Sequence, residues 1–128
     1  MNSSQTTGAS ARRETSALIG SDKVEGTAVR RPNGEKLGEI ERVMIEKRSG
    51  KVAYAVMSFG GFLGMGEEYY PIPWQKLTYN VELDAYELDI SEDQIRGAPR
   101  NADEGYRWTR DEDARIYNYW GATPYWTM

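Results

Sequence analysis

The chain has 128 residues, a net charge of −4 and a pI of about 4.9, which allows one domain with modest extensions. It contains neither cysteine nor histidine, which excludes disulfides, thiolate zinc sites and the commonest general base. Residues 1–20 lack an apolar run long enough for a signal peptide or a membrane span, so we expect a cytoplasmic protein.

The first part of the chain reads as an extension followed by a series of strands. Residues 1–17 are mostly small and polar, which predicts a disordered N-terminal segment, and Ser21–Gly26 reads as a turn. Asn33-Gly34 is a strong hairpin signal, and Gly38 predicts a bulge or a close backbone crossing. Strands are expected over 27–31, 37–46, 51–58, 69–72, 78–81 and 85–90, with a helical turn over 74–77.

Two of these strands carry specific predictions about burial. In the strand over 37–46, Val43 and Ile45 alternate with Arg42, Met44 and Glu46, which predicts that the two share one buried face. In the strand over 51–58, both faces carry apolar side chains, so it is expected to be the central strand of the sheet, covered on both sides.

The last part of the chain predicts two short helices. Ser91 with Gln94, and Thr109 with Glu112, have the spacing of capping boxes, and glycine with proline follows each predicted helix. In the second helix, Ile116 and Trp120 fall on one face. The fold class is therefore mainly β, a small antiparallel barrel with short C-terminal helices. Its expected parts are the disordered segment 1–17, the barrel 18–97, and a linker, helix and aromatic tail over 98–128.

No stretch of the chain has the pattern of a catalytic, metal or cofactor site. The glycine-rich loop 60–66 is followed by Glu67 and Glu68, where a phosphate-binding loop needs lysine and a hydroxyl. These two adjacent acids would point to opposite faces of a strand, and the acidic run 111–113 lacks the spacing of a calcium loop. We therefore expect no enzyme activity and no cofactor.

Several motifs together resemble a known family. They are Asn33-Gly34-Glu35-x-Leu37-Gly38, Gly50-x-x-x-Tyr54-Ala55-Val56, and the loop Gly60-Gly61-Phe62-Leu63-Gly64 with Pro73-Trp74 beyond it. Over about residues 18–97 the chain resembles the PRC-barrel domain, and its tail is similar to that of small stand-alone bacterial members. The resemblance implies a compact barrel used for docking or assembly.

Two well-known roles of that family do not transfer to this sequence. Reaction-centre H subunits are anchored by a transmembrane helix, which the sequence does not predict. Ribosome-maturation factors carry a separate N-terminal domain, which residues 1–17 are too short to form.

The expected function is that of a non-enzymatic protein-binding and assembly module. It is expected to associate with itself as a homodimer and to bind another, unknown protein. The alternatives are an RNA-processing or ribosome-associated factor and a small-ligand carrier. The aromatic tail could pack on its own barrel or on a second subunit, and the negative charge of this segment disfavours nucleic acid. The candidate contact residues are Phe59, Phe62, Leu63, Tyr69, Trp74, Trp120 and Trp126.

Overall fold

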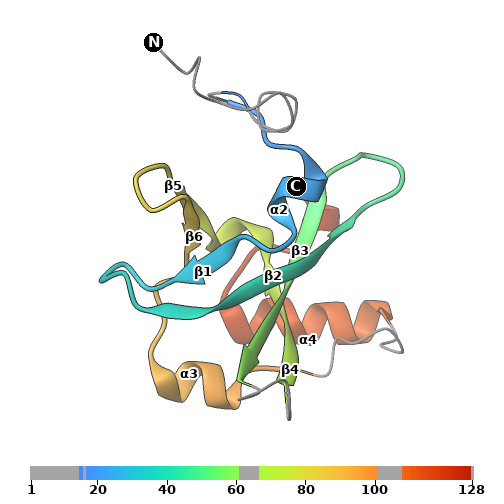
Figure 1. The fold of residues 1–128 in the computed structure, drawn as a ribbon. Helices are drawn as coiled ribbons and strands as arrows, with labels where there is room; N and C mark the ends of the chain where they lie inside the picture. The colour runs from blue at the N-terminus through green and yellow to red at the C-terminus, as the bar shows by residue number, and fades with distance from the viewer. Residues whose placement is uncertain (1–14, 16, 61–66, 101–107, 128) are drawn as a thin grey trace.

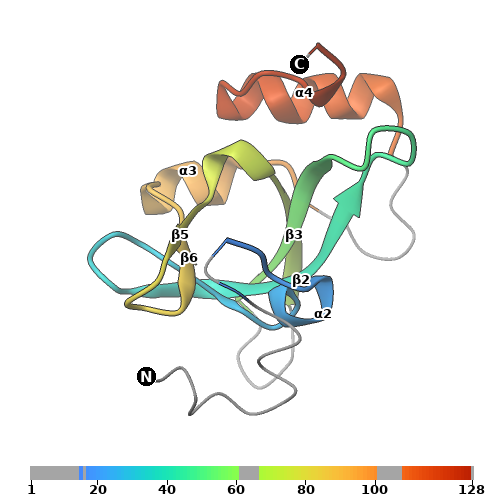
Figure 2. The same cartoon turned by 90° about the horizontal axis from the view of Figure 1, so that it is seen from above.

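The computed structural model describes residues 15, 17–60, 67–100 and 108–127, and its main feature is one curved six-stranded sheet (Figures 1 and 2). The strands are β1 (Ala28–Arg30), β2 (Lys36–Ile45), β3 (Val52–Gly60), β4 (Glu67–Pro73), β5 (Thr78–Asn80) and β6 (Ala85–Glu87). The helices are α2 (Ser21–Val24), α3 (Glu92–Gly97) and α4 (Arg110–Trp120), with single 3-10 turns η3 (Trp74–Lys76) and η4 (Tyr125–Thr127).

The pairing of the strands confirms the mainly β class and corrects two details. The strand order is β4-β3-β2-β1-β6-β5, and no pairing joins the outer strands β4 and β5 in the described part of the chain, so the sheet is open where a closed barrel was predicted. The contact between β1 and β6 is parallel, with Val29 opposite Tyr86, whereas the other pairs are antiparallel. Strand β6 pairs with β1 although the two are far apart in the sequence. Turn signals mark only neighbouring strands, so they could not predict this pairing.

Strand β3 is buried on both faces, as predicted. It pairs with β2 on one side and β4 on the other, and residues 53–58 are all buried. It lies next to the outer strand β4, so it is an interior strand but not the central one. This position brings Tyr54 beneath helix α4, which matters for the site described below.

The prediction of one alternating buried face for β2 is wrong. Ile45 is 50% exposed, whereas Val43 and Met44, which are neighbours in sequence, both pack partly against the core. The register against β3 shifts between Ile40 and Arg42 and again between Met44 and Ile45. Each irregularity adds a residue to one strand, which moves the following side chains to the other face of the sheet.

Gly38 lies where two strands approach closely, which confirms its prediction. The register between β1 and β2 shifts beside it, and a Cβ atom at this position would lie 2.0 Å from the backbone oxygen of Ser58. Backbone on a neighbouring strand cannot rotate away as a side chain can, so only glycine fits here without displacing β3.

The helix ends follow local chemistry. Ser91 and Gln94 form the predicted capping box of α3, and the Thr109 hydroxyl accepts a hydrogen bond from Glu112 N at the start of α4. Gly121 ends α4 with a φ of 65°. The segment after Gly20 is a single helical turn where only a turn was predicted, and its Lys23 carbonyl accepts a bond from the Thr27 hydroxyl at 2.6 Å.

Candidate interaction surface

Helix α4 packs on the chain's own sheet, which resolves the open question about the aromatic segment. Ile116 and Trp120 are buried, as their spacing predicts, and Tyr117 between them is buried as well. The helix contacts β4, and it crosses behind that strand in Figure 1. Three large side chains thereby leave water, and such burial contributes roughly 2–3 kcal/mol each before ordering costs.

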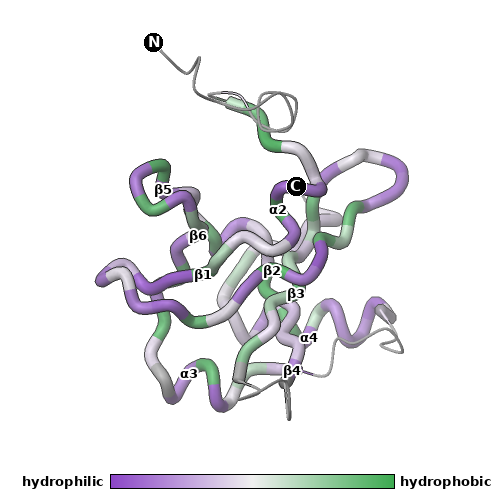
Figure 3. The backbone as a smooth tube through the Cα atoms, viewed as in Figure 1, coloured by the Kyte–Doolittle hydropathy of each residue, from purple (hydrophilic) through white to green (hydrophobic). Residues whose placement is uncertain are grey.

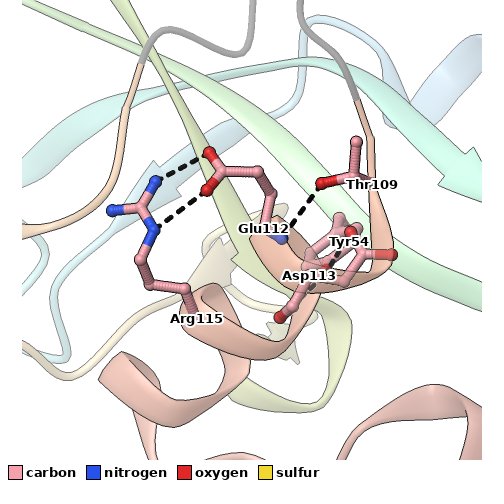
Figure 4. Close-up of polar contacts among 5 residues, drawn as sticks. All are labelled: Tyr54, Thr109, Glu112, Asp113 and Arg115. Atoms are coloured by element: carbon pink, nitrogen blue, oxygen red, sulfur yellow. Dashed lines mark hydrogen bonds and ion pairs between the residues drawn. The ribbon is translucent and has the colours of Figure 1, made fainter.

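Two buried tyrosines fix the position of α4. The Tyr54 hydroxyl donates to Asp113 Oδ1 at 3.0 Å (Figure 4), and the Tyr117 hydroxyl donates to the Ala53 carbonyl at 3.0 Å. Burial, followed by the nearby charge of Asp113, raises the pKa of both phenols, so they stay protonated donors at ordinary pH. The bonds therefore orient the helix and satisfy polar groups inside an apolar contact.

Asp113 is a buried acid whose ionisation opposes folding. Burial raises its pKa, while the bonds from Tyr54 and Tyr125 and the charge of Arg110 lower it by less. A carboxyl group with a raised pKa in the folded state binds its proton more tightly there, so its contribution to stability falls as pH rises through that pKa.

We therefore expect Asp113→Asn to gain stability relative to the wild type as pH rises. The amide oxygen can still accept the Tyr54 hydrogen bond, but the amide carries no charge to desolvate. Urea unfolding of both chains near pH 4 and pH 7 measures this difference, since carboxyl groups titrate from about pH 4 upward. An unchanged difference between the two pH values would contradict the role assigned to Asp113.

The surface of α4 and the chain end add weaker contacts. Glu112 forms a two-pronged ion pair with Arg115 (Figure 4), and the bond from Arg115 lowers its pKa. Gln75 of η3 exchanges two hydrogen bonds of 2.8 Å with the backbone of Thr123. The Arg110 guanidinium lies 4.1 Å from the centre of the Trp126 ring. The chain end is therefore held to η3 and to helix α4.

The structure does not gather the predicted contact residues into one patch. Trp120 is only 7% exposed, so it belongs to the core and offers no surface, which corrects its assignment. The other described members are half-buried, and two pack on a core tyrosine: Phe59 on Tyr70 and Trp74 on Tyr86. Phe62 and Leu63 lie outside the described residues. Tyr69 and Trp126, the remaining predicted contact residues, are half-buried as well.

An apolar surface lies at the β5 end of the sheet, and Trp74 is the one predicted contact residue that lines its groove. The sequence reasoning missed its exposed residues. Val81 is 78% exposed, Leu18 is 72% exposed and Leu83 is 38% exposed. Figure 3 shows hydrophobic stretches in green at the tip of the hairpin that joins β5 to β6. A signal was present, since two apolar side chains stand in a four-residue turn that is otherwise acidic.

A groove runs beside this surface. It encloses about 380 Å³ and is lined by Thr15 and by apolar and aromatic residues from the N-terminal segment, η3, Leu77, β5 and β6. Within it the ring of Tyr86 contacts both Trp74 and Tyr79, at centroid distances of 5.2 and 5.0 Å. We name the exposed residues Leu18, Val81 and Leu83, together with strand β5 and this groove, the β5 surface.

The acidic side chains that the sequence singled out serve structural contacts where they are described. Glu68 accepts hydrogen bonds from Arg100 at 2.9 Å and from Tyr70 at 3.2 Å. Among the described residues no cluster of three acids could hold a metal ion, and no helix is both long and apolar enough to cross a membrane. The glycine-rich loop falls outside the described part of the chain, apart from Gly60 at the end of β3.

A comparison with protein-family models identifies the family of this chain. The family model of the PRC-barrel domain matches residues 18–95, which is more than half of the sequence. The chain therefore belongs to the PRC-barrel domain family, and the resemblance drawn from its glycine, tyrosine and Pro-Trp motifs is confirmed. A search of curated proteins found no match to the chain.

Proposed function

We propose that this chain is a non-enzymatic protein-binding and assembly module of the PRC-barrel family, and that it associates with itself. The observation that carries the proposal is the exposed apolar β5 surface. Soluble proteins often expose single apolar side chains, but here Leu18 lines an aromatic groove, and Val81 and Leu83 directly follow the strand β5 that borders it. Exposed apolar residues around such a groove are typical of a docking site. Val81 and Leu18 are largely exposed, so covering them would release water from both.

The absence of histidine and cysteine from the whole sequence supports the non-enzymatic part of this proposal. Asp113, which is buried, is bonded to Tyr54 and serves to hold α4. The basic side chains of the β1–β2 turn also have local partners, since Arg31 pairs with Glu35 at 3.2 Å and Lys36 pairs with Glu39 at 2.9 Å. This arrangement favours a protein partner over nucleic acid.

A small-ligand carrier is the second candidate, and the groove of about 380 Å³ is the observation that favours it. Pockets for small molecules usually span roughly 300–1,000 Å³ and have apolar walls. The two functions differ in one respect, because ligand binding would leave the mass of the particle unchanged.

The mass of the full chain in solution tests the proposal. Sedimentation equilibrium over a wide concentration range is expected to show a reversible shift from 14.6 kDa toward twice that mass. The surface is small and only partly apolar, so we expect dissociation in the micromolar to millimolar range rather than a permanent dimer. A single 14.6 kDa species at every concentration would refute self-association.

A further inference from the structure

A second, smaller pocket lies between the end of β2, the start of β3 and helix α4. It encloses about 110 Å³, and its lining includes the buried Asp113, the half-buried Glu46 and the aromatic side chains of Tyr54, Trp108 and Tyr125. Neither lysine nor arginine is among the described residues that line it. This volume is the liquid share of about four water molecules, so the pocket has room for a group of about four or five heavy atoms.

Asp113 lines this pocket as a buried acid with no cation in contact with it. The residue is only 4% exposed, and its carboxyl group accepts hydrogen bonds from the hydroxyls of Tyr54, at 3.0 Å (Figure 4), and Tyr125. Within the described part of the chain it forms no ion pair with lysine or arginine. A buried carboxylate is normally paired with a cation, so the pocket favours a positively charged ligand.

The charges around Tyr125 favour such a ligand as well. Burial raises the pKa of the Tyr125 phenol most, the charges of Asp113 and Glu46 raise it further, and the charge of Arg110 lowers it. Two acids and one base therefore act on the same hydroxyl. The Arg110 guanidinium is shared with the ring of Trp126, whose centre is 4.1 Å away. When both carboxyl groups are ionised, one cation faces two anions, and a second cation at this place lowers the electrostatic energy.

The walls of the pocket determine which kind of cation suits it. Aromatic faces attract cations, indole most strongly, and the side chains of Trp108 and Tyr125 are both partly exposed. The hydroxyls of Tyr54 and Tyr125 already donate to Asp113, so the site needs the charge of a ligand more than its N–H groups. A trimethylammonium group has this character, since its charge is spread over methyl groups and it has no N–H.

We propose that this pocket binds a small organic cation through a trimethylammonium group. Asp113 and Glu46 supply the negative charge, and Trp108 and Tyr125 supply the aromatic walls. The bound cation would offset the cost of an ionised Asp113 inside the protein. This inference is independent of self-association, because the pocket shares no described residue with the β5 surface.

An NMR titration of the full chain with choline tests the proposal. Choline is expected to shift the indole N–H signal of Trp108, which a Trp108→Phe variant assigns, with a dissociation constant of about 1 mM, in the range for so small a ligand. Two comparison compounds isolate the chemistry: the neutral analogue with a tert-butyl group in place of trimethylammonium, and ethanolamine, whose ammonium carries no methyl groups. Each is expected to bind about tenfold more weakly.

Three substitutions locate the site. Asp113→Asn is expected to weaken choline binding about tenfold and Glu46→Gln about threefold, because each removes one negative charge from the lining. Asp111→Asn removes the same charge from the exposed face of the same helical turn, outside the lining, and is expected to change binding by less than about twofold. Circular dichroism checks that each variant is folded, and Glu46→Gln keeps the test valid if Asp113→Asn is not.

The outcomes separate the parts of the proposal. No saturable shift up to about 20 mM choline, well above the expected constant, overturns it. Equal binding of the neutral analogue or of ethanolamine overturns the choice of trimethylammonium, and an equal loss in Asp111→Asn overturns the site. Phosphatidylcholine vesicles carry the same group on a lipid: co-sedimentation of the chain with them would assign a lipid head group, and its absence beside choline binding would assign a free small molecule.

Discussion

A chain that ends at Gly105 is expected to lose most of its stability, because it lacks α4 and the tail. Ile116, Tyr117 and Trp120 are buried against the sheet, and deleting any one large core side chain typically costs about 2–5 kcal/mol. Small domains have only about 5–15 kcal/mol to lose. Thermal unfolding followed by circular dichroism should show a much lower melting temperature or no cooperative transition at all.

A single substitution provides the matched version of this test. Ile116→Ala is expected to cost about 2–5 kcal/mol, because the side chain is fully buried. Asn118→Ala, on the exposed face of the same helix, is expected to change stability by less than about 0.5 kcal/mol. If the truncated chain and Ile116→Ala both melt like the wild type, α4 does not form part of the core.

The second large effect is expected from Gly38→Ala. The added methyl group would lie 2.0 Å from the Ser58 backbone oxygen, so β2 and β3 would have to separate locally. Overpacking of this kind usually costs about 1–3 kcal/mol, and an unyielding backbone neighbour places this site at or above the upper end. Urea unfolding measures the loss, and an unchanged slope would show that the native state alone is affected.

Gly50→Ala is the control for this prediction. Gly50 has a φ of +77° and no atom within 4 Å of an added Cβ, so alanine there meets backbone strain but no clash. We expect it to cost about 1 kcal/mol, the usual difference between glycine and alanine in that conformation. Equal losses at the two positions would contradict the close approach at Gly38.

Local patterns were sufficient to predict the strands and the helices α3 and α4, but not the single turn α2. Asn33-Gly34 marks the turn between β1 and β2, and Gly34 has the positive φ, 94°, that such a turn requires. The capping residues Ser91 and Thr109 mark the starts of α3 and α4 because their hydroxyls satisfy backbone N–H groups that the helix leaves free. These features depend on a few adjacent residues, and that is why the sequence reveals them.

Features that depend on distant contacts could not be predicted. The alternation in β2 failed at Ile45 because two irregularities against β3 change the face of its side chains, and nothing within β2 marks them. The parallel pairing of β1 with β6 joins segments more than fifty residues apart. Trp120 was proposed as a contact residue because an aromatic residue carries a large apolar area but no indication of whether its own sheet or a second subunit covers it.

From the sequence we expected an apolar docking surface, but not the residues that are exposed at the β5 surface. An apolar docking surface was expected from exposed aromatic residues, but the structure buries or half-buries those it describes and exposes Leu18, Val81 and Leu83 instead. Val81 was read as the end of a strand and Leu83 as part of a turn. Their exposure becomes evident only when the turn over 81–84 is seen to project beyond the edge of the sheet, as in Figure 1.

Amide hydrogen exchange of the wild-type chain at low and high protein concentration tests the central claim most directly. Self-association through the β5 surface predicts that backbone amides of residues 78–83 gain protection as concentration rises, while those of the proline-containing edge strand β4 do not. Concentration-dependent protection elsewhere with none in this segment, or no concentration dependence at all, would contradict the account.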